Sequence, residues 1–311
     1  MSTKWPIETD VPVETDPITF EVDMAGDPES KKLALLLHGF PESKFSWRYQ
    51  MPLLADQGYR VWAPNQRGYG HTTRPKGVKN YTIDHLVNDV DKLMAASGCE
   101  EILLVGHDWG GAVAWAFALN PPRPIDRLVI MNLPHPTIFG RSLRTRKQFM
   151  RSWYTMFFQI PGLPEKLLSL RDAEPIGRAF TEMAIDKSRF PTEVTDVYRR
   201  NALLPGALTG MVNWYRGARK TPPVWREVFQ NPPVLETPTL MIWGEEDTAL
   251  GIETTYGTEK LVRDFTLRYL PQVSHWVQQE APEVVNRMLE AWLSGQPVPE
   301  AEAEAEKRAA P

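Results

Sequence analysis

The chain has 311 residues, of which 42% are hydrophobic and 24% charged, so it is long enough to bury one large core. Its formal net charge of -4 provides no overall basic field, and we therefore do not expect nucleic acid or anionic lipid as a partner. With a single cysteine, no apolar stretch of a secretory signal and no segment long enough to span a bilayer, the sequence predicts a soluble protein of a reducing cytoplasm.

Apolar runs in the first hundred residues predict the strands of a sheet. Alternating apolar residues at 18–24 indicate a half-buried antiparallel strand, whereas the continuous runs at 33–37 and 60–63 indicate buried strands. Apolar residues at helical spacing predict a helix at 83–96, which Gly98 ends. This alternation of strands and helices predicts an α/β protein with a doubly wound, mostly parallel sheet.

The pentapeptide Gly106-His107-Asp108-Trp109-Gly110 lies between an apolar run and a helix pattern rich in small residues. A strand that turns into a helix across flanking glycines is typical of the nucleophile elbow of α/β-hydrolases, which exposes its central side chain above the sheet. Here that side chain is a carboxylate. A carboxylate that attacks an acyl carbon forms a reactive anhydride, whereas at a strained or halogen-bearing saturated carbon it forms an ordinary alkyl ester. The elbow therefore predicts alkylation of the enzyme at Asp108.

The alternation of strands and helices is interrupted in the second half of the chain. Strands are predicted at 128–131, 240–243 and 267–270, but the long interval is rich in Arg, Phe, Trp and Tyr and broken by prolines. We therefore predict an α/β-hydrolase fold whose core is formed by residues 1–135 and 234–295, with an inserted helical cap at 136–233. Residues 296–311 have no evident apolar face to dock, and we expect a disordered tail there.

A site of this fold requires a nucleophile, an acid and a histidine in this order along the chain. Asp247 and His275 follow the last two predicted strands. Because ligand groups in open parallel sheets gather at the carboxyl ends of strands, three strands can deliver Asp108, Asp247 and His275 to one place. An ordinary turn aspartate and a structural histidine are the simpler interpretations, with Glu245 and Glu246 as rival acids. Chain order and strand-end position favour the catalytic interpretation.

The remaining histidines lack this combination of position and order. We interpret them as structural or supporting residues: His38, His71, His85, His107 and His135. No His-x-x-x-His or Cys-x-x-Cys pair suggests a metal site, and we expect no cofactor.

The segment His38-Gly39-Phe40-Pro41-Glu42 follows the buried strand at 33–37, where the fold places an oxyanion-hole donor. Pro41 has no backbone N–H. The candidate donors are therefore the backbone N–H groups of Phe40 and of Trp109, directly after the nucleophile. A plain Gly-Pro turn is the simpler alternative.

Together these segments resemble the epoxide hydrolases of the α/β-hydrolase fold, from His38 to His275. The resemblance implies two cap tyrosines that contact the epoxide oxygen, and the segments around Tyr154 and Tyr215 match the two family segments. Opening the ring produces an alkoxide, to which a protonated phenol can donate a hydrogen bond and then a proton. Aromatic packing within the cap is the alternative. The family more often has Asp at the position of Asn65, in a supporting loop.

The resemblance implies a cofactor-independent epoxide hydrolase that converts a small-molecule epoxide to a vicinal diol. Asp108 would attack a ring carbon, and His275, oriented by Asp247, would activate the water that hydrolyses the ester. The nearest alternative is a haloalkane dehalogenase, which usually has a polar halide donor at the position of Phe40. A fluoroacetate dehalogenase would have arginine in place of Trp109. A hydrolase-fold small-molecule receptor is a further alternative, and the cap aromatics predict either an apolar substrate pocket or only a cap core.

Overall fold

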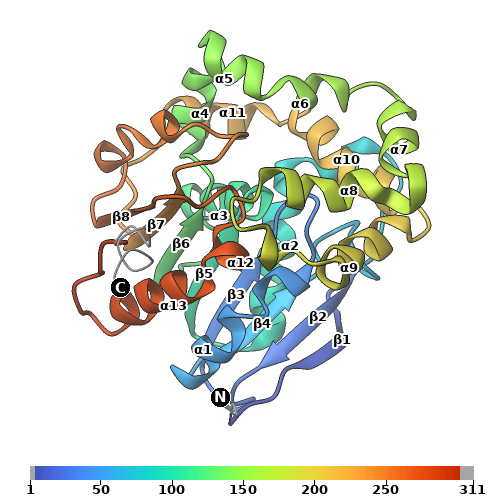
Figure 1. Ribbon diagram of the computed structural model, residues 1–311. Helices are drawn as coiled ribbons and strands as arrows, with labels where there is room; N and C mark the ends of the chain where they lie inside the picture. The colour runs from blue at the N-terminus through green and yellow to red at the C-terminus, as the bar shows by residue number, and fades with distance from the viewer. Residues whose placement is uncertain (1–3, 302–311) are drawn as a thin grey trace, which may run out of the picture.

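The computed structural model describes residues 4–301, and an eight-stranded sheet forms its centre (Figure 1). The strands are β1 (Glu8–Glu14), β2 (Thr19–Ala25), β3 (Lys32–Leu37), β4 (Arg60–Pro64), β5 (Glu101–His107), β6 (Arg127–Met131), β7 (Thr239–Gly244) and β8 (Phe265–Leu270). Their order across the sheet is β1-β2-β4-β3-β5-β6-β7-β8. The β1–β2 and β2–β4 pairs are antiparallel, and all the other pairs are parallel. The predicted α/β-hydrolase fold with its doubly wound, mostly parallel sheet is confirmed.

After a charged first residue, the strands β3, β5 and β6 are buried, because both faces of the sheet are covered. In β3, Leu33, Leu35 and Leu37 pack into one core with residues of α2 (Ile83–Ser97) and α3 (Trp109–Leu119). The alternate residues Ala34 and Leu36 pack into a second core with α1 (Gln50–Asp56) and α13 (Pro282–Leu293). Successive side chains of a strand point to opposite faces, so a strand buried on both sides reads as one continuous apolar run.

A helical insertion separates β6 from β7. It contains α4 (Pro136–Ser142), α5 (Arg146–Arg151), α6 (Trp153–Phe157), α7 (Leu163–Leu168), α8 (Leu170–Met183), α9 (Thr192–Leu203), α10 (Ala207–Ala218) and α11 (Pro223–Gln230). The last short helix of the core, α12 (Val277–Glu280), follows β8. An aromatic contact joins the insertion to the core, since Phe180 of α8 packs against Trp276 at 4.5 Å between ring centroids. Within the insertion, Phe180 also stacks on Tyr198 of α9 at 4.2 Å. None of the helices described is long and apolar enough to cross a membrane.

The chain after α13 is in part docked on the core. Val298, within the segment expected to be a tail, is buried in the second core, because this apolar side chain has a groove to fill. The guanidinium of Arg268 donates to the carbonyl oxygen of Val298 at 2.7 Å and holds the segment against β8. Residues 302–311 of the expected tail lie outside the described residues.

Candidate active site

Asp108 lies at the sharp turn between β5 and α3. Its backbone has a φ of 48° and a ψ of -122°. Residues other than glycine rarely adopt a positive φ. The turn is so tight that a Cβ on Gly110 would lie 2.0 Å from the carbonyl oxygen of Leu37. A Cβ on Gly106 would lie 2.5 Å from the carbonyl oxygen of Gly110. Both flanking glycines are therefore needed for the elbow that presents the Asp108 carboxylate.

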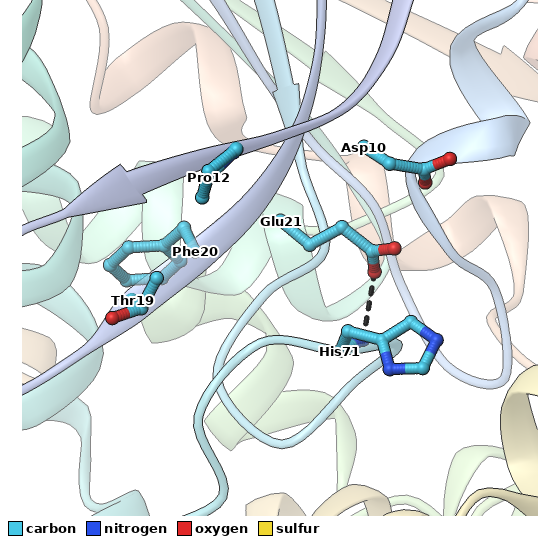
Figure 2. A pocket seen from close by; sticks show the side chains of 6 residues that line it. All are labelled: Asp10, Pro12, Thr19, Phe20, Glu21 and His71. Atoms are coloured by element: carbon cyan, nitrogen blue, oxygen red, sulfur yellow. Dashed lines mark hydrogen bonds between the residues drawn. The ribbon is translucent and has the colours of Figure 1, made fainter.

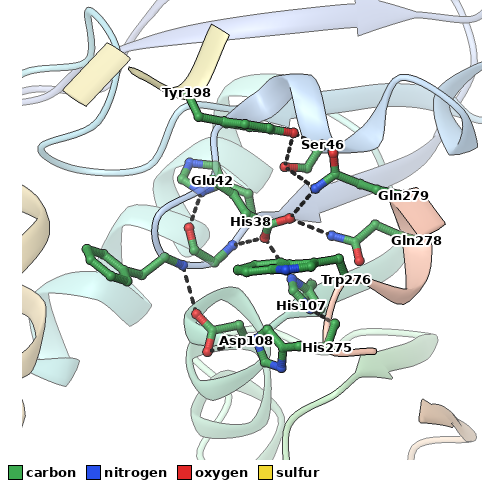
Figure 3. Close-up of polar contacts among 12 residues, drawn as sticks. His38, Glu42, Ser46, His107, Asp108, Tyr198, His275, Trp276, Gln278 and Gln279 are labelled. Carbon is green, nitrogen blue, oxygen red and sulfur yellow. Dashed lines mark hydrogen bonds and ion pairs between the residues drawn. The ribbon is translucent and has the colours of Figure 1, made fainter. Parts of the chain in front are cut away.

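The structure brings the three residues expected to form the site together at the carboxyl edge of the sheet. His275 Nδ1 donates to Asp247 Oδ2 at 2.6 Å. On the other side of the ring, His275 Nε2 lies 3.5 Å from Asp108 Oδ2 (Figure 3). All three follow the ends of β5, β7 and β8, as the strand-end argument predicts. The rival acids Glu245 and Glu246 are exposed to solvent.

Asp247 is held by four donors, including one residue that sequence reasoning missed. Besides His275, Asn132 Nδ2 donates to Asp247 Oδ2 at 2.7 Å, and the backbone N–H groups of Ala249 and Leu250 donate to Oδ1 at 2.8 and 2.9 Å. Burial opposes ionisation, but His275, Asn132 and the Leu250 N–H outweigh it and hold the pKa of Asp247 below its usual value. This acid is therefore a carboxylate that fixes the orientation of the His275 ring.

His275 stands between two carboxylates in a buried position. Burial by itself lowers the pKa of an imidazole, but the charge of Asp247 and the hydrogen-bonding and charge of Asp108 raise the pKa of His275 to about 10. The resting site therefore holds an imidazolium between two anions. Both facing carboxylates contribute to the raised pKa.

The loop after β3 supplies a backbone donor to the nucleophile. The Phe40 N–H donates to Asp108 Oδ1 at 2.7 Å. The close approach requires glycine at the preceding position, because a Cβ on Gly39 would lie 2.4 Å from the Asp108 Cβ. Trp109 is the first residue of α3, and the N–H groups of a first helical turn have no acceptor within the helix. The two oxygens of Asp108 thus differ: Oδ1 faces the Phe40 N–H and Oδ2 faces His275.

The two tyrosines of the insertion come together above Asp108. Tyr154 on α6 and Tyr215 on α10 have ring centroids 5.9 Å apart, and Tyr215 packs against Phe40 at 5.3 Å and Trp109 at 4.9 Å. Burial, followed by the charge of Asp108, raises the pKa of Tyr154. Burial, Tyr154 and then Asp108 raise the pKa of Tyr215 well above its usual value. Both phenols are therefore protonated at neutral pH and able to donate.

Aromatic rings make the surroundings of these tyrosines apolar. Phe158 packs against Phe40 at 5.4 Å and against Tyr215 at 4.8 Å between ring centroids. The Phe40 side chain therefore contacts other rings and offers no polar donor at this position. Trp109 packs edge-on against Trp214 at 5.9 Å. Such a lining suits an apolar ligand, with polar groups restricted to the carboxylates, the histidine and the phenols.

A buried ion pair lies next to this site (Figure 3). Glu42 Oε2 accepts from the Gly39 N–H at 2.8 Å and lies 2.7 Å from His107 Nδ1. Its Oε1 accepts from the side-chain amides of Gln278 and Gln279, both at 2.8 Å. Burial opposes the charge of Glu42, but His107 and the Gly39 N–H hold its pKa down at about 2. Glu42 is therefore an ionised, fully buried carboxylate.

Both ring nitrogens of His107 have partners. Its Nδ1 faces the Glu42 carboxylate, and its Nε2 lies 2.8 Å from the carbonyl oxygen of His275. These two contacts fix the orientation of the ring. The pair joins the donor loop at Gly39, the residue before the nucleophile and the backbone of His275. Sequence reasoning classed His107 as supporting but did not detect Glu42, whose partners lie far away in the sequence.

The second histidine beneath the site is neutral. His38 Nδ1 donates to the carbonyl oxygen of Gly39 at 2.9 Å, and its Nε2 accepts from the Gln66 N–H at 3.1 Å. Burial lowers the pKa of His38 to about 4. Asn65, at the position where the resemblance leads one to expect Asp, is buried and accepts from the Lys44 N–H at 2.9 Å. The supporting loop is thus held in place by an amide.

We predict that Glu42→Gln lowers the free energy of unfolding by about 3–5 kcal/mol, because it breaks the fully buried pair of Glu42 and His107 by removing one partner. The pKa of Glu42 falls from 4.5 to about 2 in the folded chain, so the stabilisation is complete above the unfolded pKa and disappears as the pH falls through about 2. The measurement is urea unfolding over a range of pH. The exposed Glu29→Gln variant is the control, and an equally small effect of both substitutions would contradict the buried ion pair.

An open cavity lies apart from these residues. It has a volume of about 450 Å³ and is lined by Asp10, Pro12, Thr19, Phe20, Glu21 and His71 on the outer strands (Figure 2). The Glu21 carboxylate accepts from the backbone N–H of His71 at 2.7 Å. The cavity contains none of the residues expected at the site. Within residues 4–301, no cluster of three or more His, Cys, Asp or Glu is arranged to hold a metal ion.

The chain is similar in sequence and in structure to known proteins. The alpha/beta hydrolase fold family matches residues 34–282. The AB hydrolase superfamily protein YfhM of Bacillus subtilis is 36% identical over 285 residues, which cover 91% of this chain and 97% of that protein. Epoxide hydrolase 4 of Homo sapiens is 37% identical over 276 residues, which cover 87% of this chain and 74% of that protein. The structure of the Bacillus megaterium epoxide hydrolase in complex with an inhibitor matches with a TM-score of 0.82 at 26% identity, covering 91% of this chain and all of that chain.

Proposed function

Because the chain belongs to the alpha/beta hydrolase fold family and to its epoxide hydrolases, we propose that it converts epoxides to vicinal diols through a covalent ester on Asp108. The observation that carries this proposal is the environment of the Asp108 carboxylate. One oxygen faces a backbone donor and the other faces a histidine, beneath two tyrosines that burial keeps protonated. This arrangement suits a carboxylate that attacks a carbon and is later regenerated.

In the first step, Asp108 Oδ2 attacks a carbon of the epoxide ring. A bond forms between Oδ2 and that carbon, the ring C–O bond breaks, and its electron pair stays on the departing oxygen. Tyr154 and Tyr215 donate hydrogen bonds to this oxygen, and one of the phenols protonates it. Oδ1 stays at the Phe40 N–H and becomes the carbonyl oxygen of the ester. No cofactor or metal takes part in this step.

In the second step, water hydrolyses the ester. His275, oriented by Asp247, takes a proton from the water, which attacks the Asp108 Cγ. The negative charge that develops on Oδ1 is stabilised by the backbone N–H groups of Phe40 and Trp109, and losing one such donor typically costs about 10²–10³ in rate. The bond from Cγ to Oδ2 then breaks, and Oδ2 takes one of the two protons of the water and leaves as a hydroxyl of the diol. The other proton stays on His275, beside the regenerated Asp108 carboxylate.

Ester formation prepares His275 for its role as the base. In the resting site the ring is an imidazolium because two carboxylates face it, and an imidazolium cannot accept a proton. The ester at Asp108 carries no charge, so the pKa of His275 falls once the first step is complete. The proton that His275 loses replaces the one that the phenol gave to the departing oxygen, so the phenol is restored and the histidine becomes a base when a base is required.

We predict that Asp108→Asn lowers the pKa of His275 from about 10, because the amide mimics the uncharged ester and removes one of the two facing charges. At pH 8 the wild-type ring is expected to be doubly protonated, whereas the variant holds a larger neutral fraction. The measurement is ¹⁵N NMR of histidine-labelled protein, with the His275 signal assigned from the His275→Gln spectrum. An unchanged titration of His275 in Asp108→Asn would contradict the switch.

The inserted helices at 136–233 act in this proposal as a cap over the nucleophile. They deliver Tyr154 and Tyr215 to Asp108, and they contribute the ring of Phe158 to the lining. An apolar epoxide is therefore the expected substrate class. The test is diol formation from a panel of aryl and alkyl epoxides beside a panel of chloroalkanes and fluoroacetate. We expect diols and little halide, since Phe40 and Trp109 depart from the two dehalogenase sites; halide release at a comparable rate would overturn the proposal.

The path of oxygen distinguishes the ester from direct attack by water. In heavy-oxygen water with enzyme in excess over epoxide, we expect the first-turnover diol to be almost unlabelled, because its new oxygen began as Asp108 Oδ2. The Asp108 peptide should gain the label, and repeated turnover should then label the diol. Mass spectrometry of both products is the measurement. A fully labelled first diol with an unlabelled Asp108 peptide would mean that Asp108 acts as a base or an orienting group.

A further inference from the structure

The helices α5 to α7 present apolar side chains to solvent along one side of the insertion. Of the fourteen large hydrophobic side chains that are exposed within residues 4–301, eight lie between residues 149 and 170. They are Phe149, Met150, Trp153, Met156, Ile160, Leu163, Leu167 and Leu170, and Trp153 is the most exposed at 64%. The three helices follow one another along the upper border of Figure 1. We call these eight side chains the apolar edge. A concentration of this kind marks an interaction surface.

The apolar edge lies in a strongly basic segment, although the whole chain is acidic. Residues 136–170 contain the cations Arg141, Arg144, Arg146, Lys147, Arg151 and Lys166. The one acid of that segment, Glu165, is neutralised by Arg216 at 2.6 Å, and of the cations Lys147 pairs with Glu253 at 3.1 Å. A further cation reaches the edge from α10, since Arg219 Nη1 lies 3.4 Å from the Met156 sulfur. The net charge of -4 therefore conceals a local excess of positive charge around exposed apolar groups.

We propose that the apolar edge docks on an anionic lipid surface. Exposed Trp, Phe, Met and Leu side chains enter the boundary between headgroups and acyl chains, while arginine and lysine bind the lipid phosphates. A second copy of this chain, packed by two-fold symmetry on the same edge, would bring two basic surfaces together and be disfavoured by their repulsion. A bilayer can also bind a surface that has no shaped groove, and the consecutive short helices α5, α6 and α7 form such a surface.

Docking would place the lipid next to the residues of the proposed reaction. The helix α6 exposes Trp153 on its outer side, while the following residue, Tyr154, turns inward to Tyr215 at 5.9 Å between ring centroids. An apolar epoxide dissolved in the bilayer would thus be close to the helix that carries one of the donors. This consequence rests on the proposed function, whereas the docking itself depends only on the apolar edge and its charges.

The test is flotation of the full chain with phosphatidylcholine vesicles that do or do not contain phosphatidylglycerol. We expect binding to the anionic vesicles only, and weaker binding at high salt because salt screens exposed charges. Arg144→Glu with Arg146→Glu should weaken binding by at least about 30-fold. Phe149→Ser with Met150→Ser should also weaken it. The matched controls are Lys76→Glu with Lys79→Glu, which makes the same change of charge at two exposed lysines, and Val224→Ser on α11, and both should bind as wild type does.

Three results would overturn the proposal. The first is no binding of the folded chain to anionic vesicles at low salt. The second is binding that Phe149→Ser with Met150→Ser leaves unchanged, which would indicate adsorption by charge alone, as to any acidic polymer. The third is a dimer, found by sedimentation, that this same pair of substitutions dissociates, since a second copy would then cover the apolar edge. None of these readouts depends on activity, so a failure of docking is distinguishable from a failure of the proposed reaction.

Discussion

In the His275→Gln variant, the ester on Asp108 is expected to accumulate during reaction with an epoxide. Glutamine keeps a polar group beside Asp247 but cannot take a proton from water, so the second step loses its base while the nucleophile remains. A general base contributes typically 10²–10⁴-fold to a rate, and we expect ester hydrolysis to fall by about this factor or more. The first step should continue, because Asp108 Oδ2 and the two tyrosines are untouched.

Intact-protein mass spectrometry detects the trapped ester. We expect an adduct with the full mass of the epoxide, and peptide mapping should place it on the segment that contains Asp108. The control is His71→Gln, at an exposed histidine whose backbone N–H alone is hydrogen-bonded. Normal turnover by His275→Gln, or an adduct on a residue other than Asp108, would refute the assignment of these roles.

The elements of the core were predictable because their sequences are patterned by burial on two faces. β3 after Lys32 and β7 after Thr239 are apolar, and the strand-end rule then placed Asp247 and His275 beside Asp108. The first strand, β1, escaped prediction. Its residues are mostly exposed, it contains Pro12, and its pairing with β2 is irregular between Glu8 and Val11. A polar edge strand of this kind has no hydrophobic pattern to find.

The polar residues around the site divide into those with a local signal and those without. Asn132 directly follows β6, so the strand-end rule could have found it beside Asp247. The Glu42 network had no such signal, because the side chains of Gln278 and Glu42 are 236 positions apart and meet only in the folded chain. The basic charge around the apolar edge could not be predicted from the net charge, because a net charge averages over the whole surface and says nothing about how the charges are distributed.

The double variant Tyr154→Phe with Tyr215→Phe is expected to lose nearly all epoxide opening. In the proposed mechanism each phenol donates a hydrogen bond to the charge that develops on the departing oxygen, and such a bond is worth about 1.5–3 kcal/mol, or roughly one to two decades in rate. Each single variant should therefore slow ester formation by that factor. With both donors absent, the oxygen would leave as an alkoxide in an apolar environment.

The substitution by phenylalanine isolates the hydroxyl groups from the packing of the rings. Both rings are retained, so their contacts with each other and with Phe40 should persist, and urea unfolding verifies that the fold is intact. Tyr256→Phe, at an exposed tyrosine, is the matched control and should react as wild type does. The measurement is the rate of ester formation by rapid quench and mass spectrometry before the first turnover ends. If the double variant forms the ester at the wild-type rate, Tyr154 and Tyr215 only pack the helices above Asp108, and another group must protonate the departing oxygen.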